Sequence, residues 1–383
     1  MFRGVFGGKV ERPYCKLCGS NKLLVSKNLG VCRECILSRS KEALELIMQV
    51  HVASRKPYNL PAMPPKSPKG LKCGLCVNDC RLGENEIGYC GLVVNKNNRL
   101  VRRAGTSERG LLDWYYDPLP TNCCAFICPA YGYGYPKYAY KDGPEHGYAN
   151  LAVFYGACGF NCLFCQNSQY RYMPERLEPI ISAAELVSKA HKRVSCICFF
   201  GGDPGPQMLH SLAVSKIAAE LAKREKRILR VCWETNGSMN WPLLEKAVNF
   251  ALKSGGTIKI DLKAFHEPLN QALCGVTNQQ TLENFKNIQP YLEERPEVPL
   301  LFGTTLLVPG YVDEDEVRHI ARFIADIDPT IPYSLLGFYP HFIMDDLPTT
   351  SKAHAERCLQ AAREEGLSRV KIGNVHLLSK VEY

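Results

Sequence analysis

Residues 156–167 read GACGFNCLFCQN and follow directly on the apolar run LAVFY at 151–155. The stretch holds Cys158, Cys162 and Cys165 at a C-x3-C-x2-C spacing. A structural zinc site needs a closed set of four ligands, so three thiolates are one too few. Three thiolates can instead hold a four-iron, four-sulfur (4Fe-4S) cluster with one iron left open. We therefore predict a catalytic cluster on these three cysteines.

From about residue 150 onward, short apolar runs alternate with amphipathic stretches of helical periodicity. The predicted strands lie at 151–155, 196–202, 228–235, 257–263, 300–308, 332–339 and 370–373. The predicted helices lie at 182–193, 211–225, 241–254, 281–292, 316–327 and 352–365. This alternation predicts an α/β fold, a whole or partial TIM-type barrel of about six to seven parallel strands. Active sites of such barrels lie at the carboxyl ends of the strands, where residues 156–167 stand.

The cysteine motif, with Phe164 before its last cysteine, resembles the radical S-adenosylmethionine (SAM) superfamily. The resemblance covers about residues 150–376. It implies a 4Fe-4S cluster whose open iron binds the amino and carboxylate groups of SAM. It also implies that one electron, from a donor of flavodoxin or ferredoxin type, cleaves SAM to methionine and a 5′-deoxyadenosyl radical. That radical then removes hydrogen from an unactivated carbon.

Further motifs at strand ends narrow the resemblance to the pyruvate formate-lyase activating enzyme branch. They are FFGGDPG (199–205), ETNG (234–237), DLK (261–263), LLVPG (306–310) and YPH (339–341). The cofactor-binding residues that this resemblance implies are Phe164, Gly201, Gly202, Asp203, Glu234, Thr235, Asp261, Lys263, Val308 and His341.

The implied roles differ between these motifs. The glycines 201–202 let backbone groups approach the SAM amino group, with Asp203 standing where the family has Glu. Residues 234–235 and 261–263 line a region for a monovalent cation and the SAM carboxylate. Val308 and His341 lie on the adenine side. Thr304 stands where activating enzymes commonly carry a basic residue, which puts the substrate-side contacts in doubt.

Residues 1–55 are predicted to form a zinc ribbon followed by a helix. Two C-x2-C pairs, separated by residues 19–31, are typical of a structural zinc site, and an iron–sulfur site is the alternative. Residues 19–31 suit a short hairpin, and residues 39–52 have helical spacing. The four predicted ligands are Cys15, Cys18, Cys32 and Cys35.

A proline-rich stretch, residues 56–70, is predicted to link this module to a second one over residues 71–149. The second module begins with four cysteines that can close another four-ligand site, Cys73, Cys76, Cys80 and Cys90. We favour zinc there, with an auxiliary iron–sulfur cluster as the alternative. The module resembles the N-terminal part of AmmeMemoRadiSam-type proteins. Its place before residues 156–167 argues against a simple glycyl-radical activase.

The rest of the second module is rich in tyrosine, and residues 150–383 are predicted to form the barrel. The tyrosines are predicted to cover one mouth of that barrel, or to line a pocket for a large flat ligand such as cobalamin. Nearby Cys123, Cys124 and Cys128 are candidate metal ligands, although we favour no site there. Five other cysteines are predicted to be buried thiols without a metal: Cys196, Cys198, Cys232, Cys274 and Cys358.

The net charge of +9 is concentrated at the N-terminus. Residues 1–72 hold 14 Lys and Arg against 4 Glu, so the remaining 311 residues carry a net charge of about −1. This basic piece predicts docking on an acidic protein or a nucleic acid, or simply a solvated face. The start of the chain does not resemble a signal peptide and no apolar run could span a bilayer. We therefore expect a cytoplasmic protein that does not associate with membranes.

Three enzymatic functions fit these features. The first is modification of a residue in a protein, with C-methylation as one product; a corrinoid would donate the methyl group, although no recognised cobalamin-binding domain is visible. The second is activation of a glycyl-radical enzyme. The third is modification of RNA, with the ribbon as clamp, although no RNA-binding motif is present. A non-enzymatic metal-binding scaffold is the remaining alternative.

Overall fold

The computed structural model describes residues 12–121 and 125–383. At its centre is a nine-stranded sheet of order β13-β12-β11-β10-β9-β8-β6-β5-β7. Seven of these strands are parallel: β6 (Ala149–Tyr155), β8 (Val194–Gly201), β9 (Arg230–Thr235), β10 (Ile258–Asp261), β11 (Leu301–Leu307), β12 (Tyr333–Gly337) and β13 (Val370–Gly373). Among the described residues the two edge strands do not pair, so the barrel is partial. The predicted fold class is confirmed.

Two antiparallel strands extend the sheet beyond β6. They are β5 (Gly110–Pro118), which pairs with β6, and β7 (Ile180–Ile181), which pairs with β5. The boundary that we predict at residue 149 therefore does not coincide with the edge of this sheet. The alternation of strands with helices predicts only the parallel part, because β5 precedes the first helical crossover.

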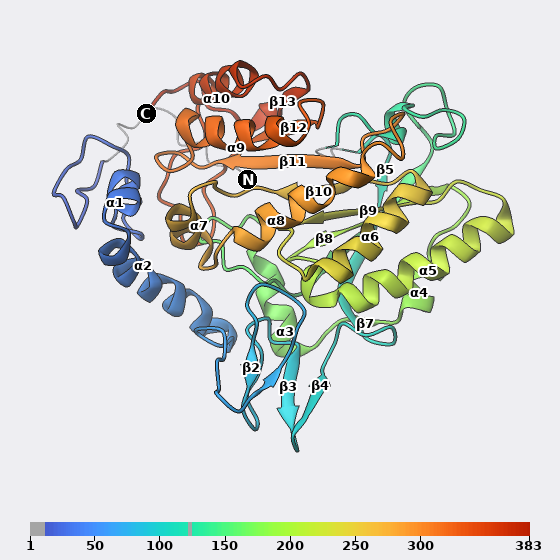
Figure 1. Cartoon of the computed structure of the whole chain (residues 1–383), viewed down its shortest axis with the longest axis horizontal. Helices are drawn as coiled ribbons and strands as arrows, with labels where there is room; N and C mark the ends of the chain where they lie inside the picture. The colour runs from blue at the N-terminus through green and yellow to red at the C-terminus, as the bar shows by residue number, and fades with distance from the viewer. Residues whose placement is uncertain (1–11, 122–124) are drawn as a thin grey trace, which may run out of the picture.

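Helices connect the parallel strands and cover the sheet on its outer side (Figure 1). They are α4 (Ala183–Ser188), α5 (Met208–Glu225), α6 (Trp241–Ser254), α7 (Glu267–Cys274), α8 (Gln279–Asn287), α9 (Glu314–Ile327) and α10 (Lys352–Glu364). Helix α9 shows why they form: Val317, Ile320 and Ile324 recur at helical spacing and are buried. Its N-cap, Asp313, accepts a hydrogen bond from the backbone N–H of Glu316 at 3.0 Å.

The N-terminal module packs beside the carboxyl ends of the strands. It contains α1 (Arg33–Ser38) and α2 (Ser40–Arg55), both of which contact α7. The Tyr311 hydroxyl, just after β11, donates to the carbonyl of Val31 at 3.0 Å. The predicted hairpin is wrong: residues 19–31 form turns without paired strands, and the second cysteine pair leads into α1. The Tyr311 hydroxyl also accepts from the N–H of Ser26 at 3.1 Å, so contacts with the barrel hold this loop without a strand ladder.

The second module is built from two small antiparallel pairs. These are β1 (Leu71–Lys72) with β2 (Arg81–Leu82), and β3 (Val93–Lys96) with β4 (Arg99–Arg102). The proline-rich segment runs along β2, where the N–H of Arg81 donates to Pro65 O at 2.8 Å. The other short elements are α3 (Tyr172–Arg176) and the 3-10 turns Lys56–Tyr58, Pro129–Tyr131, Ser168–Arg171, Gly205–Gln207, Gln289–Tyr291 and Val375–Leu377.

The tyrosine-rich segment covers the amino-terminal mouth of the barrel. Arg230, at the start of β9, donates to the Glu145 carboxylate at 2.6 and 2.9 Å and to Tyr138 O at 2.8 Å. The hydroxyl of Ser195, at the start of β8, donates to the same carboxylate at 2.8 Å. A buried ion pair with all its oxygens engaged fixes this cover in place.

No helix in the described part of the chain has the length and apolarity required to cross a bilayer.

Candidate active site

The cysteine loop lies at the carboxyl end of β6, as predicted. Two of its backbone N–H groups donate to the end of α7, from Asn161 to Cys274 O at 2.8 Å and from Leu163 to Leu273 O at 2.9 Å. Cys162 Sγ also donates to Cys274 Sγ at 3.5 Å. Helix α7, which the sequence did not predict, therefore holds the loop. Cys274 contacts a site cysteine in addition to being buried.

The loop and the neighbouring strand ends enclose one cavity of about 220 Å³. The side chains of Cys158, Cys162 and Cys165 all line it. Eight of the ten cofactor-binding residues that the sequence predicts also line it: Phe164, Gly201, Gly202, Asp203, Glu234, Thr235, Asp261 and Lys263. Phe164 belongs to the cysteine loop and the others come from the ends of β8, β9 and β10, so the structure brings together motifs that lie up to 105 positions apart in the sequence.

Two predicted residues are not among those that line this cavity. Val308 is fully buried just after β11, while Leu306 and Leu336 face the cavity instead. His341 lies outside, where its Nε2 contacts the Ser168 hydroxyl at 3.1 Å. Both follow strand ends, but motif position alone does not determine which way a side chain points.

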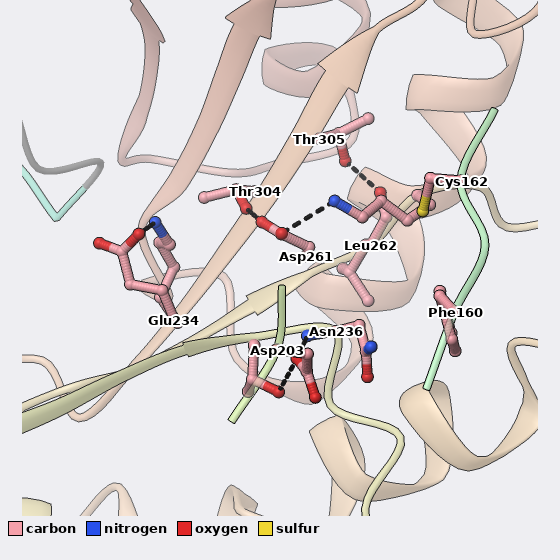
Figure 2. Close-up of polar contacts among 12 residues, drawn as sticks. Phe160, Cys162, Asp203, Glu234, Asn236, Asp261, Leu262, Thr304 and Thr305 are labelled. Carbon is pink, nitrogen blue, oxygen red and sulfur yellow. Dashed lines mark hydrogen bonds and ion pairs between the residues drawn. The ribbon is translucent and has the colours of Figure 1, made fainter. Parts of the chain in front are cut away.

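Asp203 ties the ends of β8 and β9 together (Figure 2). Its Oδ1 accepts from the Thr235 hydroxyl at 2.8 Å and from the N–H of Asn236 at 2.9 Å. Its Oδ2 accepts from the N–H of Gly205 at 2.7 Å. Burial raises the pKa of Asp203 to about 6, although these three hydrogen bonds favour the carboxylate. Asp203 thus links the ends of two strands through hydrogen bonds, and its carboxyl group also lines the cavity.

Two acid–lysine pairs also line the cavity, and Figure 2 labels their acids, Glu234 and Asp261. Lys263 Nζ lies 2.8 Å from Asp261 Oδ2, and the Thr304 hydroxyl donates to the other oxygen of Asp261. Lys259 pairs with Glu234. Burial works to raise the pKa of Asp261, but Lys263 and Lys259 outweigh it and lower that pKa. The sequence resemblance leads us to expect a basic residue at position 304. Thr304 instead donates a hydrogen bond to the Asp261 carboxylate.

Two close backbone contacts explain the paired glycines. Gly201 has a φ of +110°, and a Cβ on it would lie 2.5 Å from Tyr155 N. A Cβ on Gly202 would lie 2.4 Å from Ala157 O, at the start of the cysteine loop. The end of β8 can approach the loop this closely only without side chains.

The cavity fits the cluster and the SAM that the sequence resemblance implies. The three thiols are soft ligands suited to iron–sulfur clusters. Arg171 is fully buried beside the loop, and its Nε and Nη1 have no hydrogen-bond partner in the part of the chain that the structure describes. A buried guanidinium with free N–H groups suits the negative charge of a thiolate cluster. The acids and lysines above suit the charged groups of an amino acid.

Sequence reasoning missed three polar residues of the site. Asn236 donates from Nδ2 to Cys158 Sγ at 3.7 Å. Lys259 lines the cavity, and Arg171 lies behind the cysteine loop. Asn236 is the third residue of the ETNG motif, so the motif could have predicted it. Lys259 lies inside β10 and Arg171 lies after the cysteine loop, and no motif marks either position.

The N-terminal cysteines converge as predicted. The Sγ atoms of Cys15, Cys18, Cys32 and Cys35 all lie within 4.8 Å of one another, and Cys18 Sγ is 3.9 Å from Cys32 Sγ. This arrangement suits one metal ion. The cysteines of the second module also share one small cavity, lined by Cys73, Cys76, Cys80 and Cys90.

A larger cavity, of about 350 Å³, lies inside the barrel towards its amino-terminal mouth. It shares Phe200, Glu234 and Lys259 with the cavity of the cysteine loop. Four thiols line it, those of Cys128, Cys196, Cys198 and Cys232. Three of them were predicted to be buried thiols without further role. Cys123 and Cys124 lie outside the described residues.

The comparisons with known proteins agree with this site. A family model described as the radical SAM superfamily matches residues 152–324. The uncharacterized protein MJ0808 of Methanocaldococcus jannaschii is 27% identical over 80% of this chain and 81% of its own length.

Two further relatives are named as activating enzymes. The isethionate sulfite-lyase activating enzyme of Oleidesulfovibrio alaskensis is 26% identical over 39% of this chain and 45% of its own, so less than half of it is matched. The pyruvate formate-lyase 1-activating enzyme of Escherichia coli K12 is 22% identical over 52% of this chain and 76% of its own. Together with the three thiols in one cavity at the strand ends, this match identifies residues 152–324 as a radical SAM domain and the chain as an enzyme that carries one.

Proposed function

We propose that this enzyme cleaves SAM reductively and uses the 5′-deoxyadenosyl radical to remove hydrogen from an unactivated carbon in a residue of a partner protein. The observation that supports it most is the cavity at the strand ends. There three thiols and the charged groups of Asp203, Asp261 and Lys263 face one space. When bound, the 4Fe-4S cluster supplies the electron that splits SAM.

The residues of this chain divide the work of holding that cofactor. Cys158, Cys162 and Cys165 hold the cluster. Asp203 offers a carboxylate towards the SAM amino group, while Lys263 offers a cation towards its carboxylate. Leu306 and Leu336 give the cavity an apolar wall that suits an adenine ring. Because the thiolates must stay reduced, the reducing cytoplasm is the proposed location.

The larger cavity is the proposed place for the group that loses hydrogen. It adjoins the SAM cavity through Phe200, Glu234 and Lys259, and it lies within the barrel, which shields a radical from water. Its volume of about 350 Å³ suits one or two side chains of a peptide. C-methylation remains one product to test, by corrinoid analysis of the protein purified without oxygen.

Activation of a glycyl-radical enzyme is the second candidate function. It is favoured by the names of two relatives, which describe enzymes that activate lyases. A protein is the substrate in both functions. The basic N-terminal module, which holds 14 Lys and Arg against 4 Glu over residues 1–72, suits an acidic partner surface. A modified RNA remains the third alternative.

The first experiment tests cleavage of SAM by the protein reconstituted without oxygen. Reduced wild-type protein should form 5′-deoxyadenosine, and Cys162→Ala should form none, because it removes one of three cluster ligands. Cys358→Ala is the matched control, since this buried thiol lies on α10 outside both cavities. Undiminished cleavage by Cys162→Ala would show that the cluster is elsewhere.

The second experiment identifies the class of substrate without knowing its identity. An extract from cells grown in deuterated medium is added, and deuterium in 5′-deoxyadenosine is measured by mass spectrometry. A protein substrate predicts deuterium transfer from the macromolecular fraction that protease abolishes and ribonuclease does not. The reverse sensitivity would refute the protein substrate in favour of RNA, and transfer only from the small-molecule fraction would refute both.

A further inference from the structure

The cysteines of the second module are spaced unlike those of the first. Tetrahedral zinc with bonds of about 2.3 Å holds its sulfur ligands about 3.8 Å apart. The first set matches this, with all four Sγ atoms within 4.8 Å of one another. Among the described residues, no three of the second set, Cys73, Cys76, Cys80 and Cys90, lie that close, although all four line one cavity.

The catalytic cysteines give an internal comparison. Cys158, Cys162 and Cys165 also line one cavity without lying within 4.8 Å of one another. In a four-iron cluster each thiolate binds a different iron, so the sulfur ligands stand farther apart than around one ion. By this measure the second module resembles the catalytic site and differs from the zinc-like site.

We propose that Cys73, Cys76, Cys80 and Cys90 hold a second iron–sulfur cluster, of 4Fe-4S type, closed by four protein ligands. This replaces the zinc that spacing in the sequence led us to favour. The one other set of ligand atoms within 4.8 Å in the described chain, Glu314, His354 and Cys358, does not compete for a metal. Its His354 already uses both ring nitrogens, with Val312 O and the Tyr383 hydroxyl.

The surroundings of these thiols suit a buried anionic cluster. Two N–H groups donate to sulfur, from Tyr89 N to Cys80 Sγ at 3.5 Å and from Asn78 Nδ2 to Cys76 Sγ at 3.8 Å. Hydrogen bonds to the sulfurs stabilise a cluster and set its potential. Arg102 lines the same cavity and supplies a positive charge. The two N–H donors and the positive charge of Arg102 therefore offset part of the negative charge of four thiolates.

The second cluster lies directly against the catalytic loop. Asn78 Nδ2, which contacts Cys76 Sγ, also donates to Gly159 O at 2.6 Å. A Cβ on Gly159 would lie only 3.7 Å from Cys76 Sγ. The N–H of Val77 donates to Ser238 O at 2.9 Å, beside the Asn236 amide that contacts Cys158. One amide thus spans the gap between the two thiol sites.

Metal analysis of the wild-type protein, purified and reconstituted without oxygen, tests this. The proposal expects about eight iron atoms and about one zinc per chain, against about four iron and two zinc if the second site binds zinc. Mössbauer spectroscopy should resolve two clusters. Adding SAM should perturb the spectrum of one only, because the closed cluster has no open iron. Four irons with two zincs would overturn the proposal.

Variants assign the metals to their sites. Cys90→Ala should lower iron from about eight to about four per chain and leave zinc unchanged. Cys35→Ala should instead remove the zinc and leave iron at about eight per chain. If Cys90→Ala fails to fold, a variant with Cys158, Cys162 and Cys165 all changed to Ala replaces it. That variant should keep about four irons in a cluster that SAM does not perturb. Loss of all iron from it would refute the second cluster.

The proposal of a second cluster can be tested independently of the proposed function. A protein with two clusters and no SAM cleavage would contradict the proposed function alone. Cleavage of SAM by a protein with one cluster and two zincs would contradict this inference alone.

Discussion

Gly202 marks the closest approach between the sheet and the cysteine loop. A methyl group there would meet Ala157 O at 2.4 Å and the Tyr170 ring at 2.8 Å. Neither contact can be relieved by a flexible side chain, so the loop that carries Cys158 must shift. A shift of a cofactor site by about an ångström typically costs on the order of 100-fold in rate.

We therefore expect Gly202→Ala to lower the rate of SAM cleavage by at least about tenfold, and to lower iron content as well. The measurement is 5′-deoxyadenosine formed per chain under reducing conditions. Gly159→Ala is the matched control in the same loop, because its new methyl would meet nothing nearer than 3.6 Å. Equal activity of the two variants would contradict this account.

At the residue scale, the sequence predicts the site residues that belong to a motif and misses those that reach the site only through packing. Asp203 and Asp261 were predicted from motifs at strand ends, and both line the cavity. Arg171 was not predicted, because its role depends on burial behind the loop. Val308 is assigned to the adenine side, yet it is buried and does not line the cavity, whereas Leu306 does. The residues of a motif follow from spacing, but side-chain direction follows from packing.

At the scale of elements, the parallel strands and their helices were predicted because each carries its own periodicity. Helix α7 was missed because it has eight residues and Pro268 near its start, which gives too short a pattern to recognise. The hairpin predicted at 19–31 is wrong because contacts with Tyr311, far away in the sequence, hold that loop without strand pairing. Elements that depend on distant contacts are those that local pattern cannot predict.

Helix α2 is joined to the catalytic loop through His51. Its Nε2 lies 3.0 Å from Ala272 O on α7 and its Nδ1 lies 3.1 Å from Nδ2 of Asn161 in the loop. The first contact needs a proton on Nε2, and the second needs a bare Nδ1. The neutral ring therefore fits both partners. Burial lowers the pKa of His51 to about 4.

This pKa predicts how stability depends on pH. The unfolded chain takes up a proton near pH 6.5, whereas the folded chain takes it up only near pH 4. The unfolding free energy should thus fall as pH drops from about 6.5 to about 4, by on the order of 3 kcal/mol from this residue. Denaturant unfolding across that range measures it. His51→Gln should reduce the dependence, and what remains should include the part from His210, whose pKa burial also lowers to about 4.

At the scale of the whole molecule, the sequence predicts two cysteine modules ahead of a barrel. It does not predict how the modules dock. The first packs on α7 and the second reaches Gly159 of the catalytic loop, so both contact the site from the carboxyl ends of the strands. The tyrosine-rich segment covers the opposite mouth. Docking of this kind depends on surfaces that form only after each part has folded.

Arg33 makes a charged contact between the first module and the barrel. It lies 3.2 Å from Asp313 and 3.5 Å from Glu316, and the Glu316 side chain is fully buried. The Glu316 carboxylate also pairs with His266 and accepts from the N–H groups of Phe265 and His266. Removal of one partner from a buried pair destabilises by about 3–5 kcal/mol, and less where other partners remain.

Arg33→Met should therefore loosen the first module without unfolding the barrel. Hydrogen exchange should rise by about tenfold or more over α1 and α2, because about 1.4 kcal/mol of docking energy corresponds to that factor, and should stay unchanged over β8 and β9. Arg39→Met is the matched control, since its pair with Glu42 is exposed and its hydrogen bond to Leu17 O also stays within the first module. If both variants exchange alike over α1 and α2, the Arg33 contact does not hold the module, and other contacts, such as the packing of α1 and α2 on α7 and the hydrogen bonds of Tyr311, must hold it.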